Sequence, residues 1–94
     1  MSDEVRTSRD DERSRYEGRV DGQVVTVLAF VRQGDVLLLT HTGTEPEYRG
    51  RGLASVVTAA ALDDVRTRGE KVRAACPFAV DFLDEHPEYA DLVA

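Results

Sequence analysis

The segment 49–54 (RGRGLA) combines residue types that can hold a phosphate group. It follows an apolar, strand-like run at 36–40 and begins a run rich in Ala, Leu and Val at 53–65, which is typical of a helix. A strand that passes through two glycines into a helix leaves backbone N–H groups pointing outward at the positive helix end. Because the two arginines add positive charge, a diphosphate is the ligand that fits best. A plain strand-to-helix turn is the alternative interpretation.

Four strands and two helices are predicted to position this loop. Asp21-Gly22 is a strong hairpin-turn signal between two β-like runs. Strands are predicted at 14–20, 23–32, 35–44 and 71–76, and helices at 53–65 and 78–85. The last strand follows a helix and is therefore expected to run parallel to the third. The predicted class is α+β, with a mixed sheet of four strands built as an antiparallel meander and then β-α-β-α.

Bulk properties limit the function classes. The 94 residues make one small domain, with a densely charged segment at 1–13 predicted to be a flexible tail and an ordered domain at 14–94. The net charge of −6 argues against general nucleic-acid binding, and no apolar run has the roughly 20 residues that a membrane span needs. One cysteine cannot form an internal disulfide, so the cytoplasm is the expected compartment. Two histidines and one cysteine without ligand spacing predict no metal site, and a monomer or weak dimer is expected.

The string 44–54 (TEPEYRGRGLA) resembles the signature of the GNAT superfamily of acyl-CoA-dependent N-acetyltransferases. That signature has Arg or Gln, two residues, Gly, one residue, and then Gly or Ala, and here Arg49, Gly52 and Ala54 fill those places. The segments 76–78 (CPF) and 86–93 (HPEYADLV), with His41-Thr42, resemble a minimal single-domain branch of about 90–100 residues. The resemblance covers residues 14–94.

The resemblance implies that acetyl-CoA is the co-substrate. In the superfamily the loop backbone binds the pyrophosphate of coenzyme A, and the pantetheine arm lies along the preceding strand. The strands at 36–44 and 71–76 are then expected to splay apart to form the acyl-CoA cleft. Helices that form much of the acceptor site in larger members are missing between the first strands. The cofactor-binding residues predicted in this way are Thr42, Gly43, Thr44, Arg49, Gly50, Arg51, Gly52, Leu53, Ala54 and Ser55.

His41 and Cys76 are the candidate catalytic residues. His41 could remove the proton of an amine, and a backbone N–H near 42–44 could bind the oxyanion. A Cys76 thiolate could accept the acyl group before passing it on. In a parallel strand pair, both side chains are expected to reach one cleft. The alternatives are a solvent-facing strand histidine and an inert core cysteine.

These features predict an acetyl-CoA-dependent N-acetyltransferase that acts on a small-molecule or protein amine. The alternative is a non-catalytic acyl-CoA-binding or protein-interaction module. The missing acceptor-site helices favour the module, whereas the presence of both His41 and Cys76 favours the enzyme.

Overall fold

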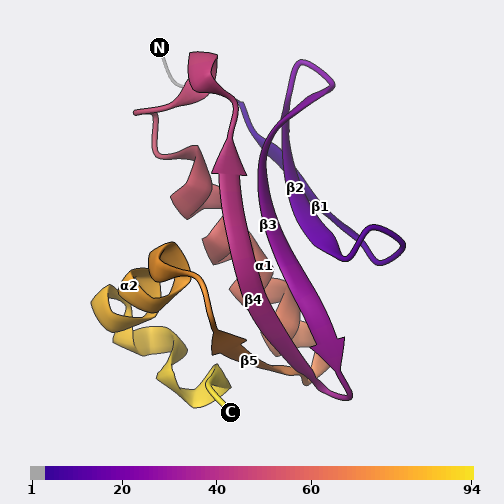
Figure 1. The fold of residues 1–94 in the computed structure, drawn as a ribbon, viewed down its shortest axis with the longest axis vertical. Helices are drawn as coiled ribbons and strands as arrows, with labels where there is room; N and C mark the ends of the chain where they lie inside the picture. Colours follow the sequence, from indigo (N-terminus) through magenta and orange to yellow (C-terminus); the bar gives the residue numbers. More distant parts are fainter. Residues whose placement is uncertain (1–3) are drawn as a thin grey trace.

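Five strands form one mixed sheet in the computed structural model, which describes residues 4–94 (Figure 1). The strands lie in the order β1-β2-β3-β4-β5, and only β4 and β5 are parallel. The fold is therefore α+β, as predicted, with five strands instead of four. The strands are β1 (Arg6–Asp10), β2 (Arg15–Val20), β3 (Gln23–Gln33), β4 (Val36–Thr44) and β5 (Lys71–Ala74).

Strand β1 lies within the segment that was predicted to be a flexible tail, and for residues 6–10 that prediction is wrong. The strand pairs antiparallel with β2, and its Arg9 side chain is only 3% exposed. The Arg9 guanidinium donates to the Glu70 carboxylate at 2.7 Å and lies over the rings of Tyr16 and Phe30. Because its ion-pair partner is 61 positions away, local composition could not reveal it. The first three residues of the predicted tail lie outside the described residues.

The meander β2-β3-β4 and the parallel return of β5 agree with the prediction. Asp21 and Gly22 both have positive φ, 51° and 80°, as a tight hairpin turn requires. Strand β5 ends two residues earlier than predicted, because Cys76 caps the next helix, α2 (Pro77–Glu85).

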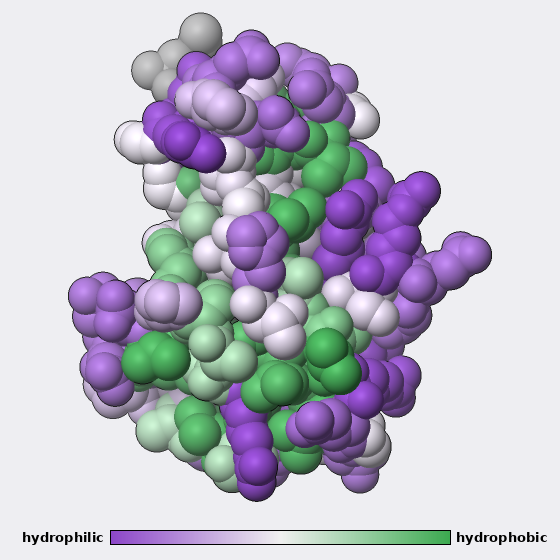
Figure 2. Space-filling view, in the orientation of Figure 1, coloured by the Kyte–Doolittle hydropathy of each residue, from purple (hydrophilic) through white to green (hydrophobic). Residues whose placement is uncertain are grey.

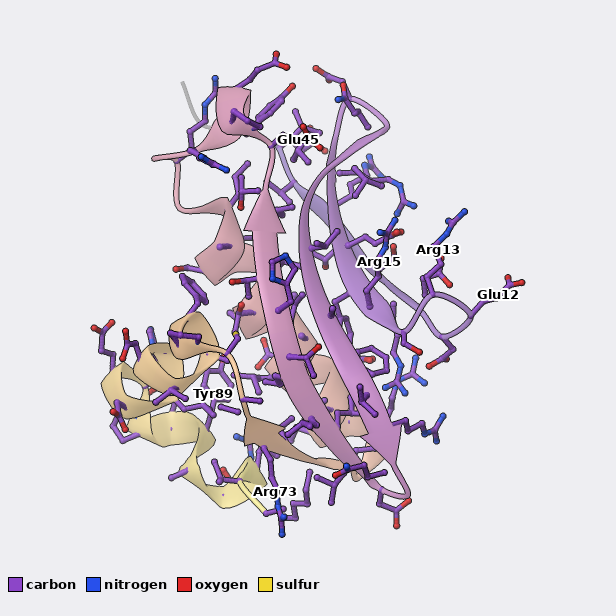
Figure 3. All side chains as sticks on the ribbon, in the orientation of Figure 1. Glu12, Arg13, Arg15, Glu45, Arg73 and Tyr89 are labelled. Carbon is purple, nitrogen blue, oxygen red and sulfur yellow. The ribbon has the colours of Figure 1, made fainter. Side chains whose placement is uncertain are left out.

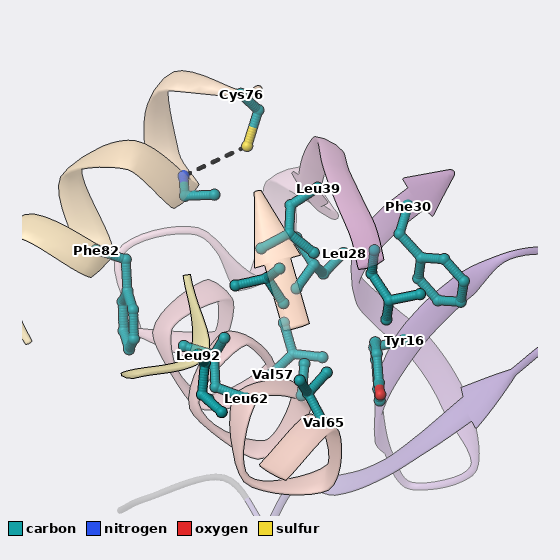
Figure 4. Packing of buried hydrophobic residues seen from close by; sticks show 14 residues of the cluster. Tyr16, Leu28, Phe30, Leu39, Val57, Leu62, Val65, Cys76, Phe82 and Leu92 are labelled. Atoms are coloured by element: carbon teal, nitrogen blue, oxygen red, sulfur yellow. Dashed lines mark hydrogen bonds between the residues drawn. The ribbon is translucent and has the colours of Figure 1, made fainter. Parts of the chain in front are cut away.

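Helix α1 (Leu53–Arg68) covers one face of the sheet (Figure 1). Its buried Val57, Leu62 and Val65 pack against Leu28 and other residues of β2, β3 and β4 (Figure 4). Helix α2 and the 3₁₀ segment η2 (Pro87–Leu92) add side chains to the same cluster. No helix within residues 4–94 covers the opposite face of the sheet (Figure 1).

An ion pair between α1 and η2 gives the fold an acid-sensitive contact. The Arg66 guanidinium holds the pKa of Asp91 below its ordinary 3.8. A carboxylate whose pKa is lowered by folding stabilises the native state above its unfolded pKa, and this contribution is lost as pH falls through the folded value. Asp91→Asn is therefore expected to lose less stability than the unmodified protein between about pH 5 and about pH 2. Urea midpoints measured across that range test this, with Asp84→Asn as the exposed control.

Candidate functional site

The second half of β4 has an open edge. Strand β5 pairs only with the first half, from Val36 opposite Lys71 to Leu39 opposite Ala74. The N–H groups of the next two residues, 75 and 76, both donate to the Leu39 carbonyl, at 2.8 and 3.1 Å. The chain then turns away into α2, so no described strand pairs with this edge of β4 beyond Leu39 (Figure 1). This is the divergence that was predicted between 36–44 and 71–76.

A β-bulge decides which backbone groups face the open edge. His41 lies opposite Ala29, but Leu39 lies opposite Phe30, so Thr40 is an extra residue in β4. Before the bulge, the Leu39 carbonyl faces β5; after it, the N–H of Glu45 donates to Val25 on β3.

One extra residue reverses the alternation of the backbone along β4. The N–H and C=O groups of Thr42 and Thr44 therefore face the open edge. They are free to pair with an extended ligand, except that Arg49 Nε donates to the Thr44 carbonyl at 3.3 Å.

Within residues 4–94, no capping side chain and no acidic residue of the first turn neutralises the positive end of α1, which follows the loop after β4. Gly50 and Gly52 have positive φ, 79° and 74°, and a Cβ at either position would meet open space. Gly52 is the N-cap residue and has no capping side chain, and the first turn carries no acidic residue. Among residues 4–94, the backbone N–H groups of 52–55 have no acceptor. An anion is what this helix end can bind.

A pocket of about 220 Å³ joins the loop, the end of β4 and the first turn of α1. Its outer wall is Phe78 of α2, and Figure 2 shows the molecular outline indented between the loop and α2. Phe78 and Tyr48 line this pocket but were not among the predicted cofactor-binding residues. Seven of the ten predicted cofactor residues line this pocket: Thr44, Arg49, Gly50, Gly52, Leu53, Ala54 and Ser55.

The remaining three predicted cofactor residues lie beside the pocket. Thr42 is on the open edge of β4, and Gly43 lines a different hollow. Arg51 lies over the Tyr48 ring, 4.8 Å from its centroid, and donates to the Glu47 carbonyl. The loop is thus flanked by two exposed arginines.

His41 is exposed on the sheet face that α1 does not cover. Its ring lies beside Gly43, where an added Cβ would be 3.3 Å from Nε2 and 3.8 Å from Val27. Among residues 4–94, the imidazole has no hydrogen-bond or ion-pair partner. The ring is therefore open to a substrate on this face of the sheet.

Cys76 lies on the other side of the sheet. Its side chain is 6% exposed within the apolar cluster that α1 packs against, and its Sγ accepts from the Ala79 N–H at 3.4 Å (Figure 4). The expectation that His41 and Cys76 reach one cleft is therefore wrong. The double hydrogen bond to Leu39 turns the chain and directs the thiol into the core.

Substitutions of Cys76 test whether its thiol has a structural or a nucleophilic role. Cys76→Ser keeps a side chain that can accept the Ala79 N–H, so for the predicted acetyl-CoA-dependent transferase we expect thiol release to stay within about 3-fold of the rate of the unmodified protein. Cys76→Ala removes the cap, and we expect it to lower stability by about 1 kcal/mol. A loss of about 100-fold or more in Cys76→Ser, with the fold intact, would instead establish a covalent role.

The sheet with its uncovered edge, followed by an uncapped helix N-terminus, is the arrangement that the resemblance predicted. The family described as "GCN5-related N-acetyl-transferase" matches residues 15–92. That is most of the chain, and the chain belongs to this family. No curated protein matches the sequence.

Solved structures show the same fold. A GCN5-like candidate N-acetyltransferase from Staphylococcus aureus has a TM-score of 0.70 at 21% identity, covering 100% of this chain and 91% of its own. The ribosomal-protein-S18-alanine N-acetyltransferase from Escherichia coli has a TM-score of 0.62 at 17% identity, covering 76% of this chain and 49% of its own. The PaiA N-acetyltransferase from Thermoplasma acidophilum, in complex with coenzyme A, has a TM-score of 0.59 at 13% identity, covering 79% of this chain and 48% of its own. This chain thus spans about half the length of the last two.

Residues 4–94 contain no group of three or more His, Cys, Asp or Glu side chains that could hold a metal ion. None of the helices in that range has the length and apolar character needed to cross a membrane.

Proposed function

We propose that this protein is an acetyl-CoA-dependent N-acetyltransferase. The observation that carries the proposal is the open edge of β4, which leads directly into the uncapped N-terminus of α1. A diphosphate at 52–55 and an extended chain along 42–44 would together occupy both features. The cytoplasm is the proposed compartment, since the single cysteine is buried and unpaired.

The donor set fits coenzyme A. Backbone N–H groups at 52–55 and the two nearby arginines suit a pyrophosphate. The alternating N–H and C=O groups of Thr42 and Thr44 suit the two amides of a pantetheine arm, which can pair like a neighbouring strand. Arg49 would have to release the Thr44 carbonyl, which leaves its guanidinium free for a phosphate.

The chemistry proposed for the site is direct transfer. The nitrogen of the acceptor forms a bond to the thioester carbonyl carbon, and the carbon–sulfur bond breaks. His41 accepts a proton from the amine, because an alkyl amine is mostly protonated near neutral pH. A backbone N–H near 42–44 that does not pair with the pantetheine arm donates to the oxygen on which charge develops. Cys76 holds the start of α2 and takes no part in the transfer.

A non-catalytic acyl-CoA-binding module is the second candidate. The observation that favours it is that short turns join β1 to β2, β2 to β3 and β3 to β4, so no helix stands beside the cleft there. An acceptor would have to bind on the sheet itself. His41, exposed and without a partner, favours the enzyme.

Thermal unfolding with acetyl-CoA, followed by thiol release with a mixture of amines, tests both candidates. We expect stabilisation and thiol release, and we expect His41→Ala to lower the release by about 100-fold. Stabilisation without release, unchanged in His41→Ala, would leave only the binding module. The absence of stabilisation at millimolar acetyl-CoA would refute both.

A further inference from the structure

A hollow of about 420 Å³ lies on the sheet, beside the end of β4. It is separate from the pocket at the α1 N-terminus, although Thr44 lines both. Its lining includes Arg15, Val27, Gly43 and Glu45. Figure 2 shows that the visible face over β3 and β4 is largely apolar or neutral in the middle and polar at the edges.

Arg15 lines the hollow, and His41 lies next to it, beside the lining residue Gly43. Arg15 pairs with Ala29, and Ala29 pairs with His41, so the three residues form one row across β2, β3 and β4. Three residues directly opposite one another point to the same face. The small Ala29 lies between the guanidinium and the imidazole, and the two ends are about 10 Å apart at the backbone, which is two strand spacings.

The Arg15 guanidinium is held in place by a buried carboxylate. Glu17 is 1% exposed and bonds to Arg15 at 2.7 Å and to Arg19 at 2.6 Å. Arg15 uses Nε and one terminal nitrogen for this bond, and among residues 4–94 its other terminal nitrogen has no partner. A fixed guanidinium with free N–H groups at the wall of a hollow is suited to an anionic group.

The opposite part of the hollow carries the features an amine needs. Glu45 lines the hollow and is exposed, and its carboxylate has no partner among residues 4–94, so it can attract a cation. The His41 ring lies next to Gly43, which lines the hollow. Figure 3 shows Glu45 beyond the end of β4, and Arg15 lower in the view on the far side of β3.

We propose that this hollow is the acceptor site and that the acceptor is a short amino acid, meaning a primary amine with a carboxylate a few bonds away. This rests on the proposed function. Arg15 binds the carboxylate, Glu45 attracts the ammonium, and His41 takes a proton from the nitrogen as it bonds to the acyl carbon. The carbon–sulfur bond breaks; of the two protons that the ammonium loses, one ends on the thiol and one goes to solvent.

The test compares matched acceptors that differ in the carboxylate. Thiol release from saturating acetyl-CoA is measured with 4-aminobutyrate and with butylamine, and glycine and β-alanine extend the series. Only 4-aminobutyrate has a carboxylate that can make a charge-assisted contact with Arg15. We therefore expect kcat/KM to be at least about 10-fold higher for 4-aminobutyrate than for butylamine. In Arg15→Gln/Glu17→Gln, we expect the ratio of the two rates to fall to about 1. The double change is used because Arg15→Gln alone would leave the buried Glu17 with only Arg19.

Two controls keep the outcomes distinct. Arg13→Gln, which removes an exposed arginine from the β1-β2 turn, is expected to keep the ratio of the unmodified protein. Stabilisation by acetyl-CoA alone is expected to persist in the double variant, because Arg15 lies outside the loop pocket. Equal rates with 4-aminobutyrate and butylamine in the unmodified protein would overturn this inference and leave the proposed transferase intact. Stabilisation without thiol release from any acceptor would overturn both.

Discussion

Gly52→Val is expected to weaken acetyl-CoA binding by at least about 30-fold, equivalent to about 2 kcal/mol. The Cβ at this position would point into open space at the helix end, where the pocket lies, so the branched side chain would occupy the room needed by a phosphate. The left-handed φ of 74° adds strain of about 1–2 kcal/mol to the folded state. Binding is measured by titration calorimetry below the melting temperature of the variant.

Gly22→Val is the control that distinguishes weaker ligand binding from an effect of backbone strain alone. Gly22 has a φ of 80° and also faces open space, but it lies in the β2-β3 turn, away from the loop pocket. We expect similar destabilisation and an unchanged affinity. Equal affinities in the two valine variants would mean that the glycine loop does not hold the phosphates.

Arg9→Ala is expected to destabilise the fold by about 3–5 kcal/mol, because it leaves a buried charge without its main partner. Glu70 is 7% exposed, and after the change its nearest remaining cation is Arg32 at 3.7 Å. The same change removes the Arg9 hydrogen bond to the Tyr16 hydroxyl. We expect the melting temperature to fall by at least about 10 °C.

The matched control is Arg6→Ala, in the same strand but with a side chain 84% exposed. An exposed ion pair contributes little, so the expected loss is below about 0.5 kcal/mol. Arg9→Ala/Glu70→Ala should be less destabilising than the sum of the two single changes. If Arg9→Ala behaves like Arg6→Ala, then β1 is not anchored to the domain through this ion pair.

Local patterns were sufficient to predict the central part of the fold. The Asp21-Gly22 turn, the β-branched run of β3 and the periodic α1 each carry their signal within about ten residues. Strand β1 was not predicted, and it shows where reasoning from local patterns fails. A charged segment becomes ordered when one arginine finds a buried partner far along the chain, and no local pattern encodes that contact.

The candidate site was only partly predicted, because only part of it is encoded by residues close together in the sequence. The loop pocket could be found because two glycines and two arginines lie together in sequence. The sides of the sheet on which His41 and Cys76 lie could not be predicted. The side of His41 depends on the extra residue Thr40, and the side of Cys76 depends on two hydrogen bonds to the Leu39 carbonyl. The hollow that Arg15 lines was not predicted either, since only the strand register brings Arg15 into one row with His41.

The most direct test of coenzyme A binding is a titration followed by the backbone amide signals in two-dimensional NMR. We expect acetyl-CoA to shift the amide signals of 42–44 and 50–55, which form the open edge and the loop. Signals of the β1-β2 turn, remote from both, should stay in place. Unchanged signals at 42–44 and 50–55 in millimolar acetyl-CoA, or shifts confined to other elements, would contradict the account.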